Sequence, residues 1–171
     1  MNKTGVIYGI NGPVVYLKGN TGFKMSEMVY VGKERLVGEV IALTKDTTTV
    51  QVFEETTGLK PGETVTASGD ALSVTLGPGI LNNIFDGIER PLSEIAKQSG
   101  KYISRGLTVD SLDTEKKWDV HVTVSEGEEL MGGAIIAETQ ETRSIVHKSM
   151  VPPDVNGTVI WAAKDGKYTI L

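Results

Sequence analysis

The first 68 residues hold a close series of short strand patterns, and this series is the feature that most constrains the fold. Clusters of Gly, Pro, Asn and Asp separate the patterns and predict tight turns. Six strands within residues 4–68 are too many for a single open hairpin, and closing them into a barrel removes the exposed edges. We therefore expect a closed six-stranded barrel, with strands at Thr4–Ile10, Pro13–Lys18, Met25–Val31, Leu36–Leu43, Thr48–Glu54 and Glu63–Ala67.

The segments between these strands are rich in residues that adopt turn conformations readily. Hydrophobic residues make up 39% of the chain but aromatic residues only 6%, so the barrel core should consist mostly of Val, Ile and Leu. The expected turns are Asn11–Pro13, Gly19–Asn20, Gly32–Glu34, Lys45–Asp46 and Lys60–Gly62.

Charge and composition exclude several classes of function. The net charge is −5 and the lysines are scattered among acidic residues, whereas a nucleic-acid-binding protein needs clustered Lys and Arg. The absence of cysteine excludes disulfides, thiol nucleophiles and cysteine-based metal sites. Residues Met1–Gly5 lead directly into a strand pattern, which predicts no signal peptide, and no apolar run approaches the roughly 18–20 residues of a membrane span. We expect no nucleic-acid partner and no direct membrane insertion.

Residues 69–109 differ from the barrel segment and predict a connection that contains one helix. A short strand, Leu72–Leu76, leads into Gly77-Pro78-Gly79, a turn whose second glycine is expected to adopt a positive φ. The helix is expected over Pro91–Ser99, because proline suits a first helical turn and Gly100 can end the helix in the left-handed conformation. Its small apolar face would consist of Leu92, Ile95 and Ala96.

Residues 110–171 return to strand patterns. Apolar and polar residues alternate without a break over Trp118–Ser125, as expected of a half-buried strand. The sequence ends within a strand pattern, so we expect it to stop inside a domain. Further strands are expected at Ala134–Glu138, Ser144–Lys148, Thr158–Ala162 and Tyr168–Leu171.

The sequence contains no Walker loop. Such a loop requires Gly-Lys followed by Ser or Thr, so that backbone N–H groups surround the phosphates and the lysine neutralises them. The three Gly-Lys pairs of this chain are followed by Glu34, Tyr102 and Tyr168. The Gly77-Pro78-Gly79 turn also lacks the third glycine of a dinucleotide-binding motif.

No other cluster of residues predicts catalysis or metal binding. His121 and His147 lack a second histidine or a carboxylate at metal-binding spacing, and we expect both to be solvated surface histidines. The acidic cluster Glu126–Glu129 falls in an expected turn and is better explained as a solvated turn than as an acid–base pair. We therefore expect no catalytic, cofactor-binding or metal-binding residue in this chain.

Three long stretches resemble, in order and spacing, the catalytic A subunit of the vacuolar and archaeal-type (V/A-type) rotary ATPases and ATP synthases. Together they cover essentially the whole chain. They comprise Gly5–Val15 with Met25–Gly32 and Leu36–Ile41, then Val50–Glu63 continuing through Leu76–Leu92, and finally Lys116–Trp118 with Gly132–Gly133 and Ile145–Pro153.

This resemblance implies an assembly role. It implies a barrel that joins its neighbours in a crown above a catalytic hexamer of A and B subunits. Residues from about 110 onward would belong to the insertion that distinguishes A from B subunits and is associated with the peripheral stalk. The family's Walker loop and catalytic glutamate lie beyond position 171, so Mg-ATP would bind elsewhere in the parent subunit, while this part would bind no cofactor. The implied location is cytoplasmic, with membrane association only through the assembled complex.

The third part also resembles a lipoyl or biotinyl carrier domain. Gly127–Glu138 and Val151–Val159 are similar to the two halves of such a domain. A carrier needs a lysine at the tip of the hairpin between its halves, but Glu138–Ser144 contains none, and Lys148 falls inside the returning strand. The resemblance thus implies a barrel-sandwich fold without support for the attachment chemistry.

The prediction as a whole is a mainly β chain with three parts: a barrel at residues 1–68, a connecting segment at 69–109 and a bulge domain at 110–171. The expected function is that of the N-terminal, non-catalytic portion of a rotary ATPase A subunit. The chain itself should not be an enzyme, whereas the parent protein would be an ATP-dependent proton or sodium translocase or an ATP synthase. The alternative is a lipoyl- or biotinyl-type carrier domain fused to a barrel.

Overall fold

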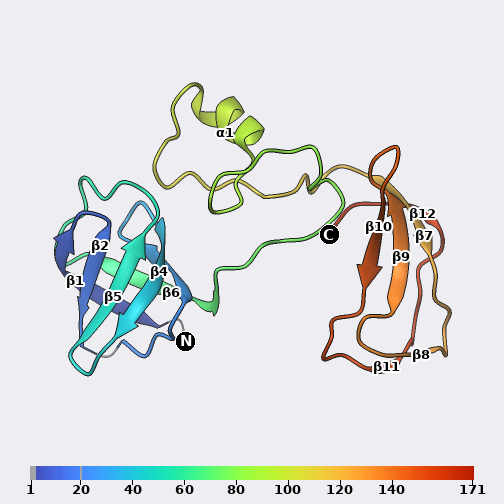
Figure 1. The fold of residues 1–171 in the computed structure, drawn as a ribbon, viewed down its shortest axis with the longest axis horizontal. Helices are drawn as coiled ribbons and strands as arrows, with labels where there is room; N and C mark the ends of the chain where they lie inside the picture. Colours follow the sequence, from blue (N-terminus) through green and yellow to red (C-terminus); the bar gives the residue numbers. More distant parts are fainter. Residues whose placement is uncertain (1–2, 20) are drawn as a thin grey trace. The chain divides into compact units, whose positions relative to one another are not determined.

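The computed structural model describes residues 3–19 and 21–171, so the expected turn at Asn20 and the expected start at Met1 and Asn2 lie outside the described residues. The chain divides into two compact units. The barrel unit comprises the chain up to Val74 together with Ile95–Thr108, and the second unit comprises Thr75–Glu94 and Val109–Leu171. Each unit has its own sheet system and is described by itself (Figure 1).

The barrel unit contains the closed six-stranded barrel that the sequence predicts. The strand order is β1-β2-β5-β4-β3-β6, and β6 pairs with β1 to close the barrel. Every neighbouring pair is antiparallel (Figure 1, blue to cyan-green). The strands are β1 (Thr4–Asn11), β2 (Val14–Lys18), β3 (Glu27–Val31), β4 (Leu36–Leu43), β5 (Thr47–Val52) and β6 (Thr64–Ala71).

The barrel core is aliphatic, as the composition predicts. Alternating residues on the six strands point inward, and most of the core side chains are fully buried. Gly38 on β4 is required by the close approach of β5, because a Cβ atom there would lie 2.7 Å from the backbone oxygen of Gln51. The core consists of Ile7, Val15, Leu17, Phe23, Val29, Val31, Leu36, Val40, Val50, Val52, Val65 and Ala67.

Several strand predictions in and near the barrel are wrong in extent, and one is wrong in kind. The strand expected at Glu63–Ala67 runs over Thr64–Ala71, and the strand expected at Thr48–Glu54 runs over Thr47–Val52. The strand expected from Met25 begins at Glu27, because Ser26 has a φ of 58° and the buried Glu27 carboxylate accepts the N–H of Lys24 at 2.6 Å. The strand expected at Leu72–Leu76 does not form. In the described part of the chain no strand pairs with this segment, and its apolar side chains are exposed. Strand propensity without a pairing partner was therefore not enough to form a strand.

The helix forms close to its expected position. α1 runs over Leu92–Ser99, directly after Pro91, and Gly100 follows with a φ of 71° and donates its N–H to Ala96. Of the expected apolar face only Ile95 is buried, whereas Leu92 and Ala96 are exposed.

The second unit is built around a four-stranded antiparallel sheet with the order β10-β9-β7-β12. A two-residue strand that was not expected, β8 (Glu129–Leu130), pairs with β11 (Gly157–Thr158), which is shorter than the strand expected at Thr158–Ala162. The four strands are β7 (Trp118–Val122), β9 (Ile135–Gln140), β10 (Val146–Met150) and β12 (Gly166–Tyr168). Burial alternates along Trp118–Val122 as predicted.

The segment before α1 folds onto itself around Asp86. The Asp86 carboxylate accepts the backbone N–H groups of Ile88 and Arg90 and the side chain of Arg90, with Arg90 Nε at 2.8 Å. Burial acts to raise the pKa of Asp86, but the hydrogen bonds and the charge of Arg90 outweigh it, and the pKa lies below its ordinary value. A turn centred on a charged, hydrogen-bonded pair therefore replaces regular structure here.

An exposed ion pair fixes β7 to the chain just before β12. His121 Nδ1 lies 2.7 Å from Asp165 Oδ2, and Asp165 Oδ1 accepts the N–H of Val122 at 2.8 Å. The hydrogen bond and negative charge of Asp165 raise the pKa of His121. The N–H of Val122 and the His121 ring lower the pKa of Asp165. His121 is exposed as expected, but it has a specific partner that the sequence did not reveal.

We expect replacement of Gly79 by valine to destabilise the second unit. Gly79 has a φ of 108°, and a Cβ atom there would lie 3.2 Å from the Trp118 ring, so a β-branched side chain should cost on the order of 1–2 kcal/mol from backbone strain alone. Both tryptophans, Trp118 and Trp161, lie in the second unit, so the thermal midpoint of tryptophan fluorescence should fall. Gly87→Ala, with open space and no positive φ, is the matched control. An unchanged midpoint for Gly79→Val would contradict the role of this turn.

We expect Asp165→Asn to lower the pKa of His121 toward its ordinary value of 6.5, measured by an NMR titration. The raised pKa of His121 contributes stability that is present below the unfolded pKa and is lost as pH rises through the folded value. The lowered pKa of Asp165 contributes stability that is present above 3.8 and is lost as pH falls. The pair should therefore stabilise the fold most between pH 3.8, the ordinary pKa of Asp165, and pH 6.5, the ordinary pKa of His121. Asp119→Asn, on the same strand, should leave the His121 titration unchanged, and an equal shift in both variants would count against the pair.

Candidate functional site

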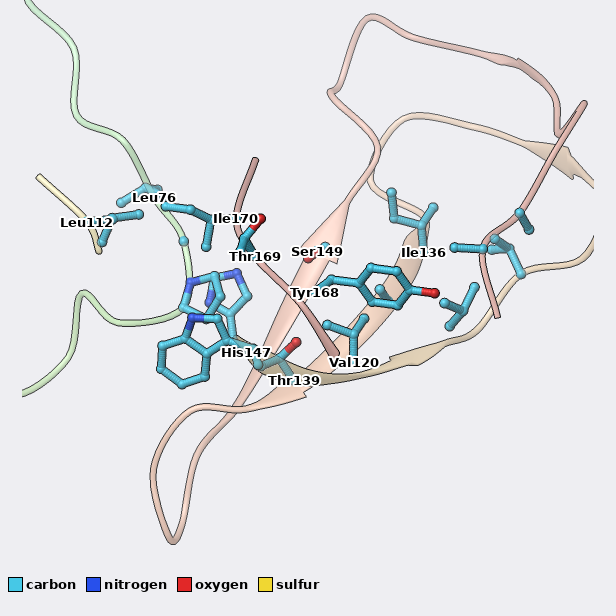
Figure 2. A pocket seen from close by; sticks show the side chains of 18 of the residues that line it. Leu76, Leu112, Val120, Ile136, Thr139, His147, Ser149, Tyr168, Thr169 and Ile170 are labelled. Carbon is cyan, nitrogen blue, oxygen red and sulfur yellow. The ribbon is translucent and has the colours of Figure 1, made fainter. Parts of the chain in front are cut away.

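The second unit contains an apolar cavity of about 490 Å³ against its sheet (Figure 2). The cavity walls come from β7, β9, β10, the chain around β12 and the segment at residues 75–78. Figure 2 shows Leu76 and Leu112 at one end of the cavity and Ile136 toward the other. Valine side chains of β7 point into it because the strand alternates, which places Val120 and Val122 on the cavity side and His121 on the exposed side.

A small number of polar groups face this apolar space. Thr139, His147 and Ser149 line the cavity (Figure 2). Within the described part of the chain, the indole Nε1 of Trp118 is a buried side-chain atom without a hydrogen-bond partner. Lys116 lies over the face of this tryptophan, with Nζ 3.7 Å from a ring centroid. The lining is mostly apolar, so the cavity suits an apolar group.

The prediction for His147 is wrong. It is not a solvated surface histidine: its side chain is only 21% exposed, and Nδ1 lies 3.6 Å from Oε2 of Glu141. The two residues lie six positions apart in the sequence, on opposite sides of the β9–β10 hairpin. This spacing does not predict a contact unless the position of the hairpin turn is already known. Glu141 was missed for the same reason, although its side chain is the more buried of the pair.

The acidic turn at Glu126–Glu129 is held by a local hydrogen bond and a short strand. Glu128 accepts the N–H of Ser125, and Glu129 lies in the short strand β8. Over residues 3–19 and 21–171, no group of three or more His, Cys, Asp or Glu side chains is placed to share a metal ion.

The carrier alternative requires an exposed lysine at the tip of the β9–β10 hairpin. Its tip closes with hydrogen bonds from Glu141 and Thr142 to the oxygen of Ile145, and the residue at the tip is Arg143, not lysine. Lys148 lies within β10 and pairs with Glu138 at 3.4 Å. The two carrier-like halves do contact each other, since the N–H of Gly127 bonds to Val159 and that of Gly133 bonds to Val151. The fold therefore resembles a carrier domain, but no lysine is presented at the tip.

Within the residues that the structure describes, no helix has the length and apolar character to span a bilayer.

Comparisons with protein families agree with both halves of the architecture. Residues 7–69 match the beta-barrel domain of the ATP synthase alpha/beta family. Residues 109–171 match the ATP synthase alpha/beta subunit barrel-sandwich domain. These two ranges coincide with the closed barrel and with the sheet of the second unit.

Individual relatives match along nearly the whole chain. The V-type ATP synthase alpha chain of Halothermothrix orenii is 50% identical over 170 residues, which are 99% of this chain and 29% of the relative. The A subunit of the A-type ATP synthase of Methanopyrus kandleri is 52% identical over 166 residues, or 97% of this chain and 28% of the relative. That of Pyrococcus abyssi is 46% identical over 170 residues, or 99% of this chain and 17% of the relative.

The chain thus spans less than a third of the length of these curated relatives. The barrel model matches the first part of the chain and the barrel-sandwich model matches the last part, and both models belong to the ATP synthase alpha/beta family. The chain belongs to the ATP synthase alpha/beta family and corresponds to the N-terminal region of the A subunit of a V/A-type ATP synthase.

Proposed function

We propose that this chain is the non-catalytic, assembly portion of the A subunit of a rotary ion-translocating ATPase or ATP synthase. The observation that carries the proposal is the closed barrel, matched by the beta-barrel domain of the family and followed by the barrel-sandwich domain. A closed barrel has no free strand edges, so it is suited to packing through its outer surface. The chemistry of the parent protein, which would use Mg-ATP, is assigned to residues outside this region.

The barrel is proposed to pack beside the barrels of neighbouring A and B subunits. Its outer surface carries exposed apolar side chains, including Tyr8 on β1 and Ile41 on β4, which are 51% and 40% exposed. Aromatic and aliphatic side chains of this kind are enriched in the centres of protein interfaces. The centroids of the Tyr8 and Tyr16 rings lie 6.2 Å apart, so the two side chains form an aromatic pair on this surface.

The bulge domain at residues 110–171 is proposed to contact the peripheral stalk. The β9–β10 hairpin projects an exposed tip that includes Arg143 and Ser144. The proposed setting is the cytoplasmic side of a membrane, with attachment only through the other subunits.

Site-specific photocrosslinking in the assembled complex tests this assignment. A photoreactive residue at Tyr8 or Ile41 of the full-length protein should crosslink to A or B subunits, and one at Arg143 should crosslink to a component of the stalk, as identified by mass spectrometry. The same residues in the isolated chain are the controls for random capture. Crosslinks from the barrel positions to the stalk, or from Arg143 to the hexamer alone, would contradict the proposal that the barrel contacts the hexamer and the bulge domain contacts the stalk.

We also propose the three-part division at residues 1–68, 69–109 and 110–171, in which the connecting segment contributes residues 75–94 to the second unit and residues 95–108 to the barrel unit. A protease-sensitive stretch is proposed near residues 100–117. Lys101 and Lys117 are exposed in segments without regular structure, so brief trypsin digestion should cut there first. Arg105 should be cut more slowly, because its guanidinium pairs with Glu34 at 2.7 Å and donates to the oxygen of Thr57 on the barrel. A persistent N-terminal piece of about 100 residues is expected. First cuts at Lys33, Arg35 or Lys45 would show that the barrel is the less stable part.

A further inference from the structure

One wall of the apolar cavity is not part of the sheet. Residues 75–81, which we name the strap, precede the Asp86 turn and belong to the second unit. Thr75, Leu76, Gly77 and Pro78 line the cavity together with side chains of β7 and β9. The cavity is therefore closed on this side by a segment without regular secondary structure (Figure 2).

A single carboxylate ties the strap to the β9–β10 hairpin. Oε1 of Glu141 accepts the backbone N–H of Gly79 at 2.8 Å and that of Leu81 at 2.9 Å. The Glu141 side chain is only 3% exposed. A buried carboxylate is costly unless it is hydrogen-bonded, and hydrogen bonds to a charged acceptor are among the stronger ones in proteins. Glu141 directly follows β9, so the sheet determines its position.

The strap is shaped to reach this carboxylate. Gly79 has a φ of 108°, the N–H of Ile80 bonds to Gly77 at 3.3 Å, and the Asn83 amide donates to the oxygen of Gly79 at 2.6 Å. The glycines also permit close packing, since a Cβ atom at Gly77 would lie 2.7 Å from the Leu112 side chain. This backbone path presents two N–H groups to one oxygen atom.

We propose that Glu141 is a latch that holds the strap closed over the cavity, and that loss of its side chain opens this wall. Both hydrogen bonds end on the same oxygen atom, so one substitution frees both amides. At the other end of the strap, the N–H of Thr75 donates to the carboxylate of Glu89, which does not depend on Glu141. Release at Glu141 should therefore free residues 79–81 and, with them, the adjoining cavity-lining residues Gly77 and Pro78, while the sheet behind them stays intact.

Amide hydrogen exchange measured by NMR on the whole chain tests the latch. In Glu141→Ala, exchange of the Gly79 and Leu81 amides should accelerate by at least about tenfold, because each loses a charge-assisted hydrogen bond. Glu141→Gln keeps one oxygen acceptor and should give a smaller acceleration at the same two amides. Glu138→Gln, which removes a charge paired with Lys148 on the same hairpin, is the matched control and should leave both amides unchanged.

A second readout follows the cavity. An environment-sensitive apolar dye should bind Glu141→Ala more strongly than the parent chain or Glu138→Gln, because the open wall exposes apolar lining. Unchanged exchange at Gly79 and Leu81 in Glu141→Ala would overturn the latch. Equal loss of protection at Val120 and Thr139 would also overturn it, since Glu141 would then support the whole sheet and not the strap.

Discussion

The pairing of β1 with β6 is the interaction on which the barrel unit depends. Thr4, Gly5 and Val6 pair with Thr66, Val65 and Thr64, and this ladder joins the first strand to the last. Without it the other five ladders would form an open sheet with two free edges, which tends to pair with other chains. Closure also encloses the aliphatic side chains on all sides, and burial of this apolar surface is the main driving force for folding.

In the second unit, carboxylates that accept backbone N–H groups order the segments outside the strands. The Asp86 carboxylate accepts backbone N–H groups in the turn before α1, that of Glu141 accepts two N–H groups of the strap, and that of Asp165 accepts the N–H of Val122. Its main sheet has only four strands, and β12 is only three residues long. Polar side chains of this kind satisfy backbone groups that no strand or helix would otherwise satisfy. This explains how long irregular segments can be ordered beside a small sheet.

The sequence predicted the parts of the fold that rest on local patterns. Leu36–Leu43 was placed at its observed bounds, and the alternation from Trp118 onward identified both the strand and its exposed face. The resemblance to A subunits was confirmed by the family models and by relatives along nearly the whole chain.

The errors arose where distant residues decide the outcome. Leu72–Leu76 has strand propensity but no partner strand, and the two-residue β8 is too short to leave a pattern. Glu141 meets residues about sixty positions earlier in the chain, and His147 lies beside it only because a hairpin folds back. Contacts of such long separation depend on tertiary structure, which propensity and periodicity do not describe.

The most direct test of an assembly role without nucleotide chemistry is calorimetric titration of the purified chain with Mg-ATP. Tight binding of a nucleotide requires backbone N–H groups around the phosphates, a lysine beside them and ligands for the magnesium ion. The sequence has no Walker loop to supply these groups. The titration should show no saturable heat at micromolar nucleotide. A clear micromolar binding isotherm would show that this region binds nucleotide itself and would contradict the assignment.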